Sequence, residues 1–189
     1  MTMNRRGVIT RRSLLGAVPI TAAAAVPGYA GIFRIGRGSR HVRRLRMYSE
    51  RTGESLDSIY WADGQYIDGA LSEVSFFMRD WRNGEVRNID KRVLDIVAAV
   101  HAALDTEEPY TLVSGYRSPD TNRMLRRRSS GVAKSSRHLL GQAADLSLRS
   151  RSVDQVFQAA SAVSTGGIGR YSSSGFVHMD CGPVRSWGR

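Results

Sequence analysis

Two histidines and one aspartate in the second half of the chain have the side-chain types of a hydrolytic zinc site. His138 and Asp145 are separated by six residues in SSRHLLGQAADLSL, and His178 lies in GFVHMDCG. Two neutral imidazoles and a carboxylate, with a fourth position left open, are ligands typical of catalytic zinc. Such an ion lowers the pKa of bound water to ~7 and supplies a nucleophile without an activated serine or cysteine.

The spacing excludes a single helix as the common support of these residues. Six intervening residues are too many for the same-face pairing of an HExxH zinc helix. We therefore place His138 in a loop and Asp145 on a strand whose alternate, apolar side chains face the core. His178 and Asp180 share one face of another strand, and the three candidate ligands converge if the two strands are neighbours. Unrelated buried polar residues fit the same spacing, which alone does not decide between these interpretations.

Apolar spacing and turn residues predict an α+β fold in a single domain without internal repeats. Strands are predicted over 110–113, 143–148, 166–171 and 176–181, with a hairpin over 45–61. Helices are predicted over 70–81, from a cap at Asp90 to Leu104, from a cap at Ser118 to Arg128, and over 153–163. These elements must position the candidate ligands.

The beginning of the chain has the order of parts of a twin-arginine export signal. Arg11 and Arg12 precede a mildly apolar stretch, 14–26, and small residues for cleavage follow at 28–30. That stretch is shorter than the ~20 apolar residues of a spanning helix. We predict three parts: a signal over 1–30, a flexible basic arm over 31–44 and a folded domain over 45–189. Export would place the domain in the periplasm, whereas an amphipathic tail or an uncleaved anchor is the alternative.

The chain is strongly basic, with a formal net charge of +11. Four arginines and no acid lie in residues 1–30, so +7 remains from Gly31 onward. Such a surplus attracts nucleic acid, anionic lipid or an acidic polymer, and export favours a carboxylate-rich polymer of the envelope. The run Arg126-Arg127-Arg128 suits such a partner, although a solvated helix face is the simpler interpretation. Cys181 is the single cysteine, which excludes an internal disulfide, and we assign it a packing role.

Several longer motifs resemble a known enzyme family. The pattern Ser136-x-His138-x-x-Gly141-x-Ala143-x-Asp145, followed by a strand with His178, resembles the metal-binding signature of peptidase family M15. These are zinc peptidases of the D-alanyl-D-alanine carboxypeptidase and Hedgehog-like fold. The motifs TGESL, DWRNGEV, SGYRSP, GGIGRY and FVHMDCGPVRSW resemble the YcbK-like murein endopeptidases within that family, over about Leu45 to Trp187. The resemblance implies a small, mainly antiparallel sheet with helices packed on it.

The resemblance also implies residue roles. His138, Asp145 and His178 would bind Zn²⁺, and Arg117 would face the substrate and stabilise the oxyanion of a tetrahedral intermediate. A surface arginine in a turn is the alternative for Arg117.

One position departs from the family pattern. Many M15 enzymes have an acidic general base three residues before the last zinc histidine, where this chain has Gly175. Asp180 is the nearest carboxylate, and we assign it as the base or as the residue that orients His178.

Together these features predict an exported zinc metallopeptidase that hydrolyses amide bonds in peptidoglycan cross-links, with L,D linkages favoured by the resemblance. The expected partners are peptidoglycan stem peptides; we expect a monomer, no nucleic acid and no membrane span after signal removal. A non-catalytic peptidoglycan-binding module on the same fold is the first alternative, because Gly175 replaces an acid. A cytosolic nucleic-acid binder is the second, because of the charge.

Overall fold

The computed structural model describes residues 42–129, 131–163 and 166–188. The predicted export signal and residues 31–41 of the predicted arm lie outside the described residues. The first strand begins at Val42, so residues 42–44 belong to the sheet and not to the arm. This boundary is corrected because residues 42–44 pair with residues 59–62 of the next strand, and backbone pairing does not require apolar side chains.

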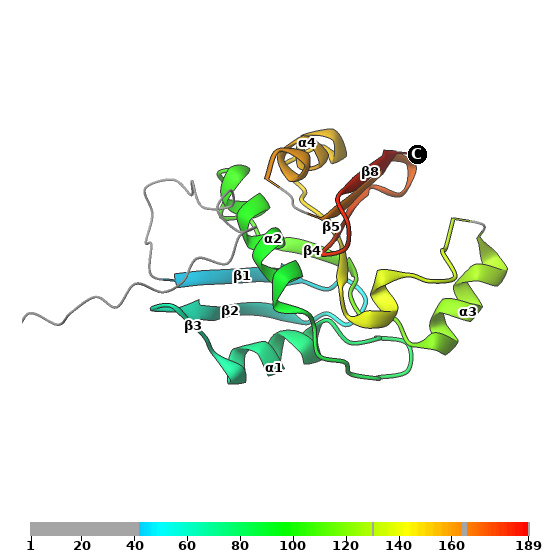
Figure 1. Ribbon diagram of the computed structural model, residues 1–189, viewed down its shortest axis with the longest axis horizontal. Helices are drawn as coiled ribbons and strands as arrows, with labels where there is room; N and C mark the ends of the chain where they lie inside the picture. The colour runs from blue at the N-terminus through cyan, green and yellow to red at the C-terminus, as the bar shows by residue number, and fades with distance from the viewer. Residues whose placement is uncertain (1–41, 130, 164–165, 189) are drawn as a thin grey trace, which may run out of the picture. The chain divides into compact units, whose positions relative to one another are not determined.

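In the described ranges, eight strands form one mixed sheet in the order β3-β2-β1-β4-β5-β7-β6-β8 (Figure 1). The strands are β1 (Val42–Tyr48), β2 (Ser55–Ala62), β3 (Gln65–Tyr66), β4 (Tyr110–Ser114), β5 (Ala143–Ser147), β6 (Gly167–Tyr171), β7 (Phe176–Asp180) and β8 (Arg185–Gly188). β1 pairs with β4 and β6 pairs with β8 in parallel, whereas the other neighbours are antiparallel. The predicted α+β class and mainly antiparallel sheet are confirmed, and β3 and β8 are additional strands.

Two helices begin at the caps that the sequence predicts, Asp90 and Ser118. The helices are α1 (Asp68–Phe77), α2 (Lys91–Ala103), α3 (Pro119–Arg128) and α4 (Val153–Val163), with the 3₁₀ helices η1 (Arg137–Leu140) and η2 (Ser172–Ser174). The Asp90 side chain accepts a hydrogen bond from the second backbone N–H of α2, and Ser118 caps α3 in the same manner. These caps satisfy backbone donors that have no partner within the helix.

α1 ends at Phe77, four residues before its predicted end at Trp81. The chain turns after it: Asp80 N–H donates to the carbonyl of Glu85, and Gly84 N–H donates to the carbonyl of Asp80. Met78, in this turn, is fully buried in the core, so the apolar residues continue at helical spacing beyond the end of α1. The predicted helix was too long for this reason.

One continuous core lies between the sheet and three of the helices. α2 contacts β1 and β7, α4 contacts β6 and β7, and α1 contacts β2. α3 stands apart from these helices (Figure 1). Cys181 packs against the core, and burial raises the pKa of its thiol to about 11, so the assigned packing role fits. None of the helices in the described ranges has the length and apolar character needed to cross a membrane.

Candidate metal centre

β5 and β7 bring Asp145 and His178 together. The two strands are antiparallel neighbours, and Asp145 lies directly opposite His178 in their register. The alternate residues Leu146 and Val177 are buried in the core. The predicted faces of both strands are therefore confirmed, and Asp145 and His178 share the face away from the core.

η1 supplies His138 to the same face. The Ser136 hydroxyl accepts a hydrogen bond from the backbone N–H of His138 at 3.3 Å and caps η1 at its start. Gly141 ends η1 with a φ of +66°, a left-handed conformation that glycine adopts without steric cost. The compact turn leads directly into β5, so His138 comes close to Asp145 despite the six residues between them.

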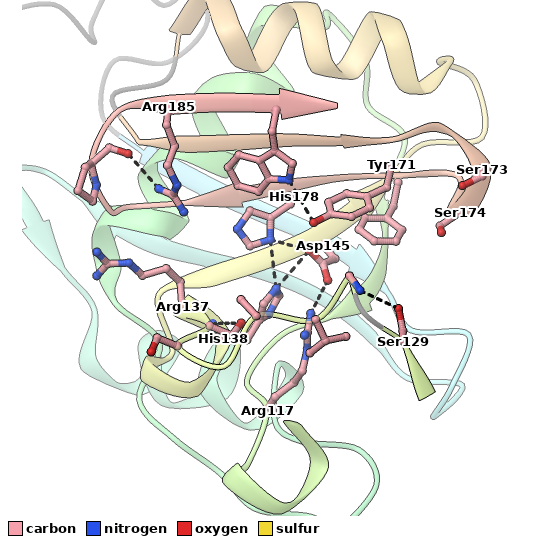
Figure 2. Close-up of a pocket in the computed structure, with 18 residues that line it drawn as sticks. Arg117, Ser129, Arg137, His138, Asp145, Tyr171, Ser173, Ser174, His178 and Arg185 are labelled. Carbon is pink, nitrogen blue, oxygen red and sulfur yellow. Dashed lines mark hydrogen bonds and ion pairs between the residues drawn. The ribbon is translucent and has the colours of Figure 1, made fainter. Parts of the chain in front are cut away.

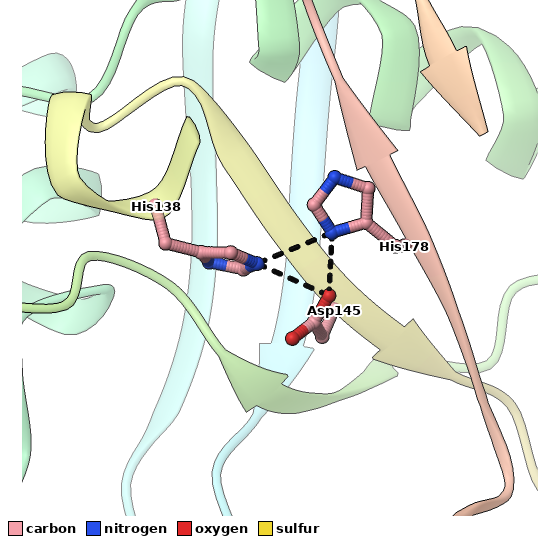
Figure 3. A group of neighbouring side chains, drawn as sticks. All are labelled: His138, Asp145 and His178. Atoms are coloured by element: carbon pink, nitrogen blue, oxygen red, sulfur yellow. Dashed lines mark hydrogen bonds and ion pairs between the residues drawn. The ribbon is translucent and has the colours of Figure 1, made fainter. Parts of the chain in front are cut away.

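The three predicted ligands converge (Figure 3). His138 Nε2 lies 3.2 Å from Asp145 Oδ1 and 3.2 Å from His178 Nδ1, and His178 Nδ1 lies 2.8 Å from Asp145 Oδ1. All three residues are buried. Tetrahedral zinc with bonds of ~2.0–2.1 Å would separate its ligand atoms by about 3.3 Å. Two of the observed distances, 3.2 Å each, are close to that value, and the third, 2.8 Å, is shorter.

The outer ring nitrogens fix which atoms face the centre. His138 Nδ1 lies 2.6 Å from the carbonyl oxygen of Gly115, so it carries a hydrogen and leaves the lone pair on Nε2. His178 Nε2 lies 2.9 Å from Asp180 Oδ2 and leaves Nδ1 toward the centre. The inward atoms are thus electron-pair donors, and a cation between them, either a proton or a metal ion, is favoured. Ligating histidines in metalloproteins are held by the same kind of outer hydrogen bond.

The charges of the cluster follow from these contacts. Burial lowers the pKa of His138, and the nearby Asp145 only partly offsets this effect. Burial also raises the pKa of Asp145, but the two imidazoles hold it well below its ordinary value. Burial lowers the pKa of His178, yet hydrogen bonds to Asp145 and Asp180 raise it to about 8. Asp145 is therefore an anion at neutral pH, as a metal ligand must be.

Arg117 lies beside the cluster. Its Nη2 donates to Asp145 Oδ2 at 2.8 Å, and its Nε donates to the hydroxyl of Ser114 at 3.0 Å. The side chain is mostly buried and lines the cavity in front of the cluster. The arginine predicted from SGYRSP thus reaches the site and is not a surface residue of a turn.

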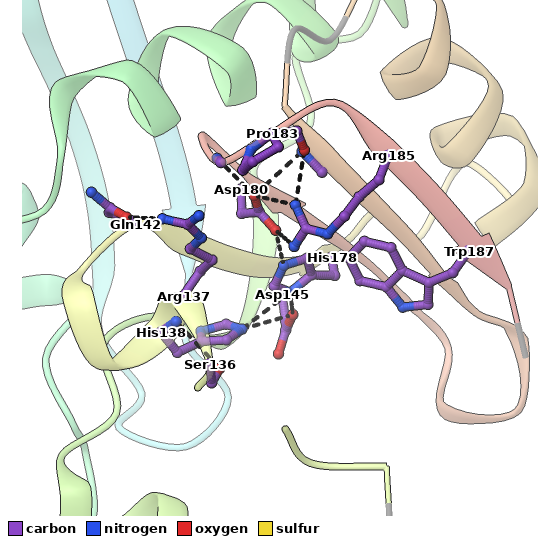
Figure 4. Close-up of polar contacts among 12 residues, drawn as sticks. Ser136, Arg137, His138, Gln142, Asp145, His178, Asp180, Pro183, Arg185 and Trp187 are labelled. Carbon is purple, nitrogen blue, oxygen red and sulfur yellow. Dashed lines mark hydrogen bonds and ion pairs between the residues drawn. The ribbon is translucent and has the colours of Figure 1, made fainter. Parts of the chain in front are cut away.

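Asp180 lies behind His178 and is fully buried (Figure 4). Oδ2 contacts His178 and accepts a hydrogen bond from Arg185 at 2.6 Å. Oδ1 accepts hydrogen bonds from Arg185 at 3.1 Å and from Gly182 N–H at 2.8 Å. Burial raises the pKa of Asp180, but these donors hold it far below its ordinary value. Both oxygens are therefore occupied.

A cavity of about 650 Å³ opens in front of the cluster (Figure 2). Trp187 forms part of its wall: its indole lies 5.3 Å from the His178 ring, and its Nε1 donates to the hydroxyl of Tyr171 at 3.1 Å. Trp187 and Arg185 come from β8, and no role was predicted for either residue. Their only signal in the sequence was the motif FVHMDCGPVRSW.

Comparisons with known proteins agree with the motifs. A family model described as peptidoglycan L,D-endopeptidase MepK matches residues 37–187. The peptidoglycan L,D-endopeptidase MepK of Escherichia coli strain K12 is 36% identical over 180 residues, which cover 94% of this chain and 96% of the relative. The probable peptidoglycan L,D-endopeptidase MepK of Haemophilus influenzae is 33% identical over 146 residues, 77% of this chain and 78% of the relative.

Proposed function

We propose, from the premise that this chain belongs to the M15 family of peptidoglycan L,D-endopeptidases, that it hydrolyses amide bonds in the peptide cross-links of peptidoglycan. The observation that carries the proposal is the convergence of three buried electron-pair donors at the back of an open cavity. Metallopeptidases use such a site to activate water in place of a serine or cysteine nucleophile.

The donor set fits zinc, which His138, Asp145 and His178 would hold. When bound, zinc lowers the pKa of water to ~7 and polarises a carbonyl group. The chain itself keeps both imidazoles in the ligating tautomer through Gly115 and Asp180. Loss of either outer bond would misdirect a ring and weaken the site.

Arg117 and Asp180 have different roles in this proposal. Arg117 lines the cavity next to Asp145, where its guanidinium would stabilise negative charge that develops on the scissile carbonyl oxygen. Asp180 is fully buried with both oxygens occupied, so we assign it the orientation of His178 and not proton transfer. Asp180 is thus a positioning residue.

The surroundings suit an acidic polymer. The last turn of α3 carries Arg126, Arg127 and Arg128, and the loop that follows lines the cavity at Ser129 and Gly131. Positive charge near the cavity would attract the free carboxylates of stem peptides. We further propose L,D specificity, twin-arginine export to the periplasm and action as a monomer.

The test uses a chain without residues 1–30, supplied with zinc and incubated with isolated sacculi. We expect mass spectrometry to show conversion of L,D-cross-linked muropeptides to monomers, with one water added for each bond cleaved. His178→Gln should abolish this conversion, whereas His101→Gln should retain it, because His101 bonds to the carbonyl of Glu108 outside the site. Intact cross-links after incubation with the zinc-loaded protein would refute the proposal.

A peptidoglycan-binding module without catalysis is the second candidate, and Gly175 motivates it. Gly175 has a φ of +75° and ends η2, so the position where relatives carry an acid is here a turn glycine. A binding module would release no muropeptides. It would sediment with sacculi to the same extent before and after metal chelation. Cleavage that stops on chelation would exclude it.

A further inference from the structure

Three arginines line the cavity, and one of them differs in its partners. Arg117 and Arg185 each pair with a buried aspartate. Arg137 forms no ion pair with any residue that the structure describes. Within the described ranges, its side chain donates one hydrogen bond, to a neutral group, the amide Oε1 of Gln142, at 2.9 Å. Most N–H donors of its guanidinium therefore have no partner among the described residues.

The Arg137 guanidinium is held by a hydrogen bond on one side and lies close to a glycine on the other. Gln142 is itself held, because its Nε2 donates to Asp90 Oδ2 at 3.3 Å. On the other side, a Cβ at Gly182 would lie 2.8 Å from Nε and 3.0 Å from Cζ of Arg137, so a larger residue would displace the guanidinium. The guanidinium lies between Gln142 and the loop after β7, on the Asp180 side of the site (Figure 4).

The described residues that line the cavity include more arginines than acidic residues. Asp145 is the acidic residue among the described residues that line the cavity, and it already contacts two imidazoles and Arg117. A guanidinium offers several N–H donors in a planar fork that matches a carboxylate. A guanidinium without an ion pair at the wall of a cavity is thus suited to an anionic group of the ligand.

We infer that Arg137 is a specificity residue that binds a free carboxylate of the stem peptide, an inference that rests on the proposed function. In an L,D cross-link between two diaminopimelate residues, the scissile nitrogen belongs to a D-centre. The carbon that bears this nitrogen also bears a free carboxylate. Arg137 is the candidate partner of this carboxylate, because it lines the cavity in front of the proposed metal ligands and forms no ion pair with a described residue.

The test compares two synthetic cross-linked peptides that differ in this group alone, one with the free carboxylate and one with the carboxamide. For the wild-type zinc enzyme we expect kcat/KM to be about 10- to 100-fold higher for the carboxylate, as for other charged hydrogen bonds. Arg137→Gln should remove this preference by slowing the carboxylate substrate alone. Arg137→Lys, which retains the charge without the fork, should restore part of it.

Arg149→Gln is the matched control, because it removes the same charge from an exposed side chain outside the cavity lining. It should keep the full preference. Equal cleavage of both peptides by the wild type would overturn the inference, as would an equal loss on both peptides in Arg137→Gln or lost preference in Arg149→Gln. If the wild type cleaves neither peptide, the proposed function fails, and the inference fails with it.

Discussion

Asp80 is a buried carboxylate that connects the loop after α1 to the segment that carries Arg117. It is 1% exposed; Oδ2 accepts a hydrogen bond from Ser118 N–H at 2.9 Å, and Oδ1 accepts one from Arg82 N–H at 3.1 Å. The neighbouring carbonyl of Met78 accepts from Tyr116 N–H at 2.7 Å. We predict that Asp80→Asn destabilises the fold and also lowers activity.

The size of the effect follows from these bonds. An asparagine side chain has one oxygen, so one of the two backbone N–H groups would face an NH₂ group and lose its acceptor. Loss of a charged hydrogen bond and a buried donor left without a partner each cost about 1–3 kcal/mol, so the free energy of unfolding should fall by about 2–6 kcal/mol. For a domain of this size, that corresponds to a decrease in Tm of roughly 5–25 °C.

The pH dependence gives a second check. Burial raises the pKa of Asp80, but hydrogen bonds from Thr121, Ser118 and Arg82 bring it below its ordinary value. A carboxylate with a lowered pKa in the folded state stabilises fully above its unfolded pKa of ~3.9, and this stability is lost as the pH falls through the folded value. The difference between wild type and Asp80→Asn should therefore be full at neutral pH and shrink in acid.

Urea unfolding followed by circular dichroism measures both quantities. Asp57→Asn is the matched control, because Asp57 is likewise a hydrogen-bonded carboxylate, but its side chain is 49% exposed and its partner is an arginine side chain; such exposed pairs contribute about 0–1 kcal/mol. Cleavage of sacculi should decrease in Asp80→Asn, since Ser118 follows Arg117 directly. An effect on stability no larger than that of Asp57→Asn, or one that does not change in acid, would refute the reasoning.

Three further outcomes are expected. Chelation of a zinc-loaded sample should abolish cleavage and lower Tm, and added zinc should reverse both changes; a chelator-resistant activity would contradict the site. Asp180→Asn should weaken zinc affinity about 10- to 100-fold, measured by competition with a chromogenic chelator, because His178 loses its charged partner; unchanged affinity would show that Asp180 does not orient the ring. A Cβ at Gly169 would lie 2.5 Å from the Trp187 indole. Gly169→Ala should therefore displace the indole, shift the tryptophan fluorescence spectrum and reduce cleavage. An unshifted spectrum would count against this packing.

The elements that the sequence predicted well depend on local signals. Alternation fixes the two faces of β5 and β7, because the side-chain period of a strand is two wherever the strand lies in the sheet. Asp90 and Ser118 mark helix starts because a cap satisfies backbone donors within the same turn. β8 lacked such a signal: its residues are mostly exposed, and its strand conformation comes from parallel pairing with β6.

The site combines local and distant information in the same way. From the sequence, we predicted that His138, Asp145 and His178 meet only if the two strands now labelled β5 and β7 are neighbours. This pairing depends on the whole sheet. The carbonyl of Gly115, which fixes the His138 tautomer, leaves no trace in side-chain patterns.

The role of Asp180 shows why some assignments needed coordinates. From the sequence, Asp180 was either a base or the partner of His178, since both roles place it two residues after His178 on one face. The choice depends on Arg185, which lies on β8 and reaches Asp180 because β8 pairs with β6. With that guanidinium on one side, His178 on the other and no exposed surface, Asp180 has no free oxygen to accept a proton from a reacting group. Arg185→Gln separates the two roles, because it removes the cation that holds both oxygens of Asp180. If Asp180 orients His178, zinc affinity measured by competition with a chelator should fall because Asp180 is held less firmly, and the pH profile of cleavage should gain no new titrating group; cleavage that rises with an added basic group would show that Asp180 can act as a base.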